Sequence, residues 1–232
     1  RMFSKYGFLT VPVVDTENRL CGIVTIDDVM DVMQEEMTED IAKMNAILPS
    51  EKPYLRRTTF DLWKSRIPWL LFLMISATFT GMIIKNFESA LARFVVLTAY
   101  IPMLMDTGGN SGSQTSVTII RALSLKEISF KDLPIVLFKE FRVSICCGAT
   151  LAGCNFVKLM VFDKVSLTVA AVICLTLFVT ILCAKIIGCL LPIITAKIGF
   201  DPAVMASPFI TTIVDAISLL VYFQFASILL GI

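Results

Sequence analysis

Histidine is absent from all 232 residues of the chain. Cysteine occurs seven times, but the sequence lacks a CxxC pair or any other metal-ligand spacing, so the cysteines are interpreted as packing residues. Basic patches with interleaved aromatic residues are lacking as well, and a net charge of +1 gives no indication of a nucleic-acid partner. The polar side chains in the hydrophobic stretches therefore carry mostly oxygen, which suits a hard cation.

Long apolar runs dominate what is present. Hydrophobic residues make up 56% of the chain and the mean hydropathy is +0.83, which excludes an ordinary soluble domain. At roughly twenty residues per crossing, we expect five transmembrane helices in an all-α membrane domain. The expected spans are 68–84, 90–120 with an interruption at 106–110, 143–162, 167–194 and 203–230.

The first part of the chain is soluble in character. Apolar strands are expected at 10–14 and 20–24 around a turn, and Thr25 with Asp28 predicts a capped helix from Ile26. This pattern indicates half of a small α/β unit, and we expect further sequence upstream of it. Beyond residue 34 the helix becomes acidic, and its residues Met37, Ile41, Met44 and Leu48 form one apolar stripe that should pack against a neighbour.

The distribution of Lys and Arg predicts the orientation in the membrane. Positive residues are dense before the first span and between the second and third, and sparse in the other two loops. The N-terminus is therefore expected in the cytoplasm and the C-terminus outside, with the protein in the plasma membrane.

A glycine-rich segment, DTGGNSGSQ, interrupts the second span. It lacks the Lys that a phosphate loop needs, so we interpret it as a discontinuous or closely packed helix in which Asn110 offers an amide oxygen to a cavity. Small residues that serve helix packing alone are the alternative. Asp106 is a second candidate at membrane depth, or else a cap for the helix that follows.

Asp215 gives the sharpest functional signal, because it is a lone carboxylate in an apolar span. Pro208, Thr211 and Thr212 precede it and are expected to loosen the helix and free carbonyl groups for a cation. A two-fold dimer would supply two such carboxylates around a hydrated Mg²⁺. The alternative is an Asp hydrogen-bonded to neighbouring helices. Lys185, also in an apolar span, could snorkel, pair with an acid or line a water-filled vestibule, and the sequence does not decide among these.

Acidic residues gather along the first long helix and the segment after it. We interpret them either as a solvated helix face or as a surface that repels an opposing acidic surface until a divalent cation bridges the two. The group consists of Asp27, Asp28, Asp31, Glu35, Glu36, Glu39 and Asp40.

Four segments in this order resemble the MgtE family of magnesium channels: GIVTIDDVMDVMQEEMTEDI, RIPWL, PMLMDTGGNSGSQ and DPAVMASPFITTIVDAISLLVYF. The resemblance implies the end of a CBS domain at 1–33, connecting plug helices at 34–66 and a five-helix pore domain at 67–232. It also implies a homodimer with the pore between subunits, Mg²⁺ at Asp215 and Asn110 at the pore lining. Family positions for sensing cytoplasmic Mg²⁺ match Asp28, Asp31, Glu36, Glu39 and Asp40, whereas no role transfers to Asp106.

The expected function is therefore passive, Mg²⁺-gated uptake of Mg²⁺, with selectivity against Mn²⁺ and Co²⁺ left open and no enzymatic activity. An ion-coupled carrier is an alternative, although no internal repeat supports it. An intramembrane aspartyl protease using Asp106 and Asp215 is a third reading, which the missing GxGD signature disfavours.

Overall fold

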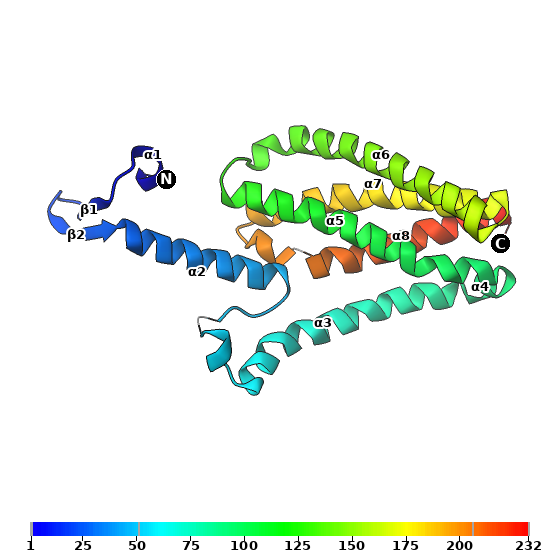
Figure 1. The fold of residues 1–232 in the computed structure, drawn as a ribbon, viewed down its shortest axis with the longest axis horizontal. Helices are drawn as coiled ribbons and strands as arrows, with labels where there is room; N and C mark the ends of the chain where they lie inside the picture. The colour runs from blue at the N-terminus through cyan, green and yellow to red at the C-terminus, as the bar shows by residue number, and fades with distance from the viewer. Residues whose placement is uncertain (1, 51, 206, 232) are drawn as a thin grey trace.

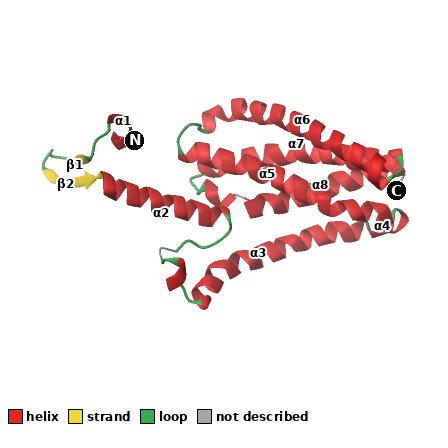
Figure 2. Cartoon of the chain, viewed as in Figure 1, coloured by secondary structure: helices red, strands yellow, loops and turns green. Residues whose placement is uncertain are grey.

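The computed structural model describes residues 2–50, 52–205 and 207–231. It is almost entirely helical, with one two-stranded sheet at the N-terminal end (Figure 2). After α1 (Met2–Tyr6), the antiparallel strands β1 (Thr10–Val14) and β2 (Leu20–Thr25) pair with Thr10 opposite Thr25. Both expected strands are thus confirmed. They lead directly into α2 (Ile26–Met44).

Helix α2 begins at the predicted cap. The Thr25 backbone N–H donates to Asp28 Oδ2 at 2.9 Å, and the Asp28 N–H donates back to the Thr25 hydroxyl. The helix runs without interruption past residue 34, so the boundary that the resemblance implies lies inside a single helix. It ends at Met44, and Leu48 is therefore not part of its face.

The expected apolar stripe on α2 does not pack as predicted. Met37 and Ile41 are exposed, and Met44 alone of the stripe contacts a core cluster, beside Ile120 and Ala203. The reason is that α2 approaches the helical bundle with the neighbouring face, which carries Asp40 and Lys43.

Helices α3 (Thr59–Asn86), α5 (Ile101–Ser124), α6 (Leu133–Lys158), α7 (Leu167–Lys197) and α8 (Ser207–Leu230) form an up-and-down bundle (Figure 1). Short helical pieces join them: η1 (Tyr54–Arg56), α4 (Glu88–Arg93), η2 (Val95–Tyr100), η3 (Phe130–Asp132), the π-helical η4 (Leu159–Asp163) and η5 (Pro202–Met205).

Helix α7 is the centre of the bundle, because α5, α6 and α8 all pack on it. Half of its most apolar stretch is buried, compared with 6% for α3, which contacts the bundle mainly through α8. Stacked rings hold that outer contact, with the Phe87 and Phe223 centroids 4.3 Å apart. The main core lies between α5, α7 and α8 and includes the fully buried Leu97, Ile173 and Tyr222.

Several expected boundaries need correction. The helix of the first span does not begin at residue 68, because the cap at Thr58 and Asp61 starts α3 at Thr59, nine residues earlier, and Pro68 lies within it. The second does not begin near residue 90, where α4 and η2 stand instead, and its expected interruption is absent because α5 is continuous.

Among the described residues, four helices are long and apolar enough to cross a membrane. Helix α5 is not one of them, because its polar residues lower its hydropathy, yet its 24 residues extend about 36 Å. Five spanning helices therefore remain a prediction.

Candidate cation-binding site

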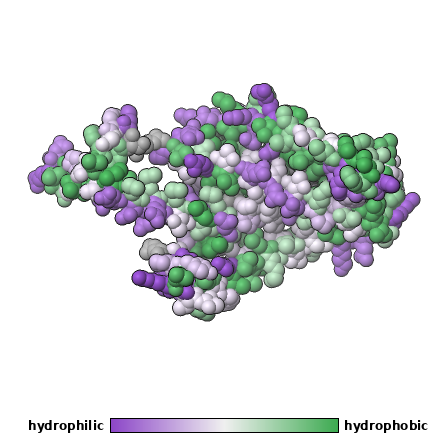
Figure 3. Space-filling model, in the orientation of Figure 1, coloured by the Kyte–Doolittle hydropathy of each residue, from purple (hydrophilic) through white to green (hydrophobic). Residues whose placement is uncertain are grey.

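The middle of α5 has a polar face that is exposed in the chain. Asp106, Asn110 and Gln114 are spaced four residues apart and therefore lie one above the other on the helix. Figure 3 shows hydrophilic residues along α5 across the middle of an otherwise apolar bundle. An exposed polar face at this depth requires water, a cation or a second protein surface against it.

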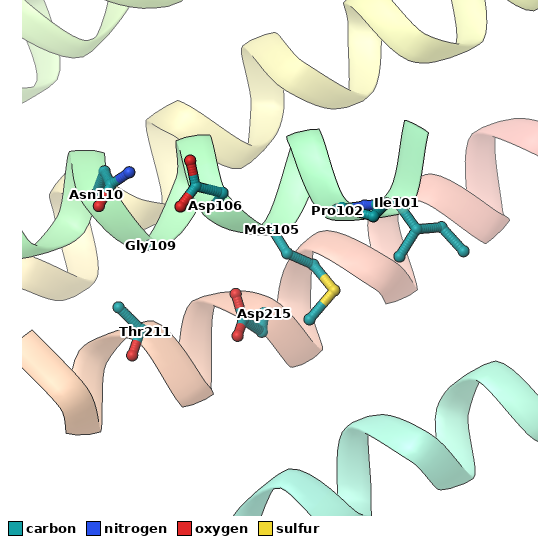
Figure 4. A pocket seen from close by; sticks show the side chains of 8 residues that line it. All are labelled: Ile101, Pro102, Met105, Asp106, Gly109, Asn110, Thr211 and Asp215. Atoms are coloured by element: carbon teal, nitrogen blue, oxygen red, sulfur yellow. The ribbon is translucent and has the colours of Figure 1, made fainter. Parts of the chain in front are cut away.

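Helix α8 lies beside this face and contributes Asp215. Its side chain is half-buried, one turn after Thr211. Both residues border a cavity of about 440 Å³ together with Asp106, Gly109 and Asn110 of α5 (Figure 4). The structure thus brings Asp215 and Asn110 together, as expected, and adds Asp106 to them.

Glycines hold α5 against its neighbours. A Cβ on Gly109 would lie 2.9 Å from Thr211 Cγ2 of α8, and one on Gly108 would lie 2.5 Å from Thr180 Cγ2 of α7. The carbonyl oxygen of Gly112 occupies the place that a Cβ on Gly188 would need. The closely packed interpretation of DTGGNSGSQ is therefore confirmed, and the discontinuous one is wrong, because the helix keeps its own hydrogen bonds.

The expected loosening around Pro208 is not observed. Pro208 stands in the first turn of α8, where a backbone N–H has no intrahelical acceptor in any case. The hydroxyls of Thr211 and Thr212 both donate to the Pro208 carbonyl, at 2.9 and 3.0 Å. That carbonyl accepts two hydrogen bonds and is therefore not free for a cation.

Asp106 does not cap a helix, since it lies well inside α5. Among the described residues, neither it nor Asp215 has a hydrogen bond or salt bridge. The alternative in which Asp215 is hydrogen-bonded to neighbouring helices is therefore not what the structure contains. Two carboxylates that share a cavity without a cationic side chain repel each other unless a proton or a cation compensates their charge.

Lys185 forms no direct pair with an acid among the described residues, and it is connected to one only through a hydroxyl group. Its side chain is 6% exposed, and its Nζ donates to Thr115 Oγ1 of α5 at 3.3 Å. The same hydroxyl donates to Glu140 Oε2 of α6 at 3.2 Å. Lys185 therefore neither snorkels nor lines the cavity. It joins α5, α6 and α7 on the side away from Asp215.

The acids of α2 do not form a ready metal centre. No group of three Asp, Glu, Cys or His side chains suited to a metal occurs in the described part of the chain. Asp28 serves the helix cap, and its hydrogen bonds with Thr25 lower its pKa. Asp31 and Glu36 are exposed on α2.

Glu39 and Asp40 lie where α2 meets the bundle. Lys43 bridges Glu39 to Asp201, whose Oδ2 is 2.6 Å from the ammonium, and these hydrogen bonds raise the lysine pKa. Burial beside Asp201 raises the pKa of Asp40. Neither Lys43 nor Asp201 was predicted from the sequence, because the two residues are distant in the chain and no motif connects them.

Comparisons with known proteins identify the relatives of this chain. A family model described as MgtE, divalent cation transporter, matches residues 101–225, and a CBS domain model matches residues 1–35. The chain is 36% identical over 230 residues to the magnesium transporter MgtE of Thermus thermophilus, covering 99% of this chain and 51% of the relative. It is 36% identical over 231 residues to that of Bacillus subtilis, covering 98% of this chain and 50% of the relative. The chain thus spans about half the length of these relatives.

Proposed function

We propose, from the premise that this chain belongs to the MgtE family of divalent cation transporters, that it conducts Mg²⁺ passively through a pore lined by α5 and α8. The observation that carries the proposal is the cavity where Asp215, Asn110 and Thr211 present oxygen atoms inside an apolar bundle. Mg²⁺ sheds its waters reluctantly, so carboxylates around a hydrated ion are a sufficient site.

The driving force is the membrane potential. It supplies about 2.3 kcal/mol per charge for each 100 mV, and Mg²⁺ carries two charges. The Lys- and Arg-rich connection between α5 and α6 lies at the same end of the bundle as α2 (Figure 1). By the positive-inside rule this end faces the cytoplasm, and the C-terminus at the other end lies outside.

A homodimer completes the pore. The polar face of α5 is exposed in one chain, and a second copy related by a two-fold axis would cover it with an identical polar face. Cross-linking tests this. In a background without the seven cysteines, a cysteine at the exposed Val117 should cross-link between subunits, whereas one at the buried Ile119 should not. Equal cross-linking at both positions, or at neither, contradicts the dimer.

Cytoplasmic Mg²⁺ closes this pore through α2. The end of α2 rests on the pore-lining helix α5 and on η5, which precedes α8 in the chain. Met44 packs with Ile120 of α5 and Ala203 of η5, and Lys43 binds Asp201 just before η5. Mg²⁺ at the regulatory acids Asp28, Asp31, Glu36, Glu39 and Asp40 would favour the closed arrangement by its higher affinity for that state.

The deciding experiment measures Mg²⁺ flux into proteoliposomes that contain the full-length protein. Asp215→Ala should abolish or strongly reduce the flux, with elution on size exclusion unchanged. Glu127→Gln, which removes an exposed acid from the α5–α6 connection, is the matched control and should keep the parent flux. Full flux in a well-folded Asp215→Ala protein contradicts the pore.

Single-channel recording separates the channel from the ion-coupled carrier. Current steps of picoampere size exceed what a carrier can produce. The unbroken α5 and α8 also favour a channel, because coupled carriers are typically built around interrupted helices. The aspartyl-protease alternative loses its support, since the family that the chain matches is described as a transporter.

A further inference from the structure

Asp106 occupies a position equivalent to that of Asp215 on the opposite wall of the cavity. Figure 4 shows two successive levels along the facing helices, with Asp106 of α5 beside Asp215 of α8, and Asn110 beside Thr211. Each helix therefore contributes one carboxylate and, one turn away, one neutral oxygen ligand. Since 109 positions separate the two acids in the sequence, only the packing of α5 against α8 creates this pair.

The close approach of the two helices makes the pairing a permanent feature. Gly109 lies between Asp106 and Asn110 on α5, and it leaves no room for a side chain against Thr211. The α5–α8 contact continues along both helices. The backbones that carry the two acids are therefore held close together at this level of the bundle.

Both carboxylates lack a positively charged partner in the described part of the chain. Lys185 is the cationic side chain buried within the bundle, and its ammonium points to Thr115 rather than to the cavity. Like charges that share a small volume repel each other unless a proton or cation compensates them. A mobile cation is the compensation that a transport pathway supplies.

The cavity has room for a hydrated ion. Six water molecules around Mg²⁺ take up on the order of 180 Å³, from about 30 Å³ for each water. The cavity volume of about 440 Å³ exceeds this. The size of the cavity therefore does not require the ion to lose its water shell.

We infer that Asp106 is a second acidic ligand of the cation site, and that the two-acid pair in each subunit selects divalent over monovalent cations. The inference rests on the proposed transport function and assigns this specificity to one residue. Its physical basis is charge, because removing one negative charge costs a divalent ion twice the Coulomb energy that it costs a monovalent ion at the same place.

The test compares Asp106→Asn, Asp106→Glu and Asp215→Asn with the parent in the full-length protein. For Asp106→Asn we expect the KM for Mg²⁺ to rise about tenfold, which corresponds to about 1.4 kcal/mol. The maximal flux should remain measurable, and the ratio of Mg²⁺ to Na⁺ flux should fall. Asp106→Glu should restore the ratio, and Glu127→Gln, with one negative charge removed outside the cavity, should leave both quantities unchanged.

Two results overturn the inference. One is an Asp106→Asn protein with the parent KM and the parent ion ratio. The other is loss of flux in both Asp106→Asn and Asp106→Glu with normal elution. That result would mean that Asp106 is needed for helix packing and does not act as a ligand. A parent protein without any Mg²⁺ flux would instead refute the proposed function. An inactive Asp215→Asn beside an unaltered Asp106→Asn refutes this inference alone.

Discussion

Replacing Gly108 with alanine tests whether close helix contact holds the cation site together. The new Cβ would lie 2.5 Å from Thr180 Cγ2, 3.0 Å from Val214 Cγ1 and 3.1 Å from Ser218 Oγ. Ordinary contacts begin at 3.4 Å, so the Thr180 side chain or the helix that carries it must shift by roughly 1 Å. Overpacking of this kind costs about 1–3 kcal/mol. Better helix propensity returns about 1 kcal/mol, which leaves a net loss of up to about 2 kcal/mol.

A matched control separates packing from propensity. Gly153→Ala, in α6, meets nothing within 4 Å and should stabilise the protein by up to about 1 kcal/mol. Thermal unfolding in detergent, followed by size exclusion, should therefore place the two alanine variants on opposite sides of the parent. Mg²⁺ flux should also fall in Gly108→Ala, because the next residue, Gly109, faces the cavity.

The double variant Gly108→Ala with Thr180→Ser identifies the contact. Serine lacks the methyl group that Thr180 places nearest to the new Cβ, so the double variant should recover much of the lost stability. Equal melting temperatures for Gly108→Ala and Gly153→Ala, or no recovery in the double variant, would refute the close-contact argument.

Three further results are expected. Lys185→Met should lower the free energy of unfolding by about 1–3 kcal/mol, because Glu140 loses the positive charge connected to it through Thr115. Adding Glu140→Gln to the same chain should recover part of this loss in thermal unfolding. The Asp40 pKa is raised by burial and by the nearby acids Asp201, Glu36 and Glu39, whereas Lys43 lowers it. Protonation of Asp40 therefore stabilises the contact of α2 with the bundle. This stabilisation is fully present below the ordinary pKa of 3.8 and is lost as the pH rises through the raised pKa. Distance measurement between spin labels on α2 and α8 would detect this, and Asp40→Asn should remove the pH dependence. Neutralising Glu36, Glu39 and Asp40 together should keep the channel open at Mg²⁺ concentrations that close the parent, and unchanged closure would assign these acids to a solvated helix face.

Local features of the sequence determined a large part of the fold. The cap at Thr25 depends on Asp28, three positions away, and it forms as this spacing predicts. The strands and the long apolar runs follow equally from nearest neighbours and hydropathy. Asp215 could be singled out for the same reason, since a charged residue in an apolar run is visible without any tertiary information.

The tertiary structure decided which residues meet. The polar segment of α5 was expected to interrupt its helix, but a continuous helix keeps all its backbone hydrogen bonds. Gly108, Gly109 and Gly112 allow this segment to pack closely against α7 and α8. The pairing of Asp106 with Asp215, the bridge from Lys43 to Asp201, and the connection of Lys185 to Glu140 through Thr115 all join residues far apart in the chain. No periodicity encodes such pairs, because they depend on the rotation and height at which whole helices pack, and these are set by many side chains at once.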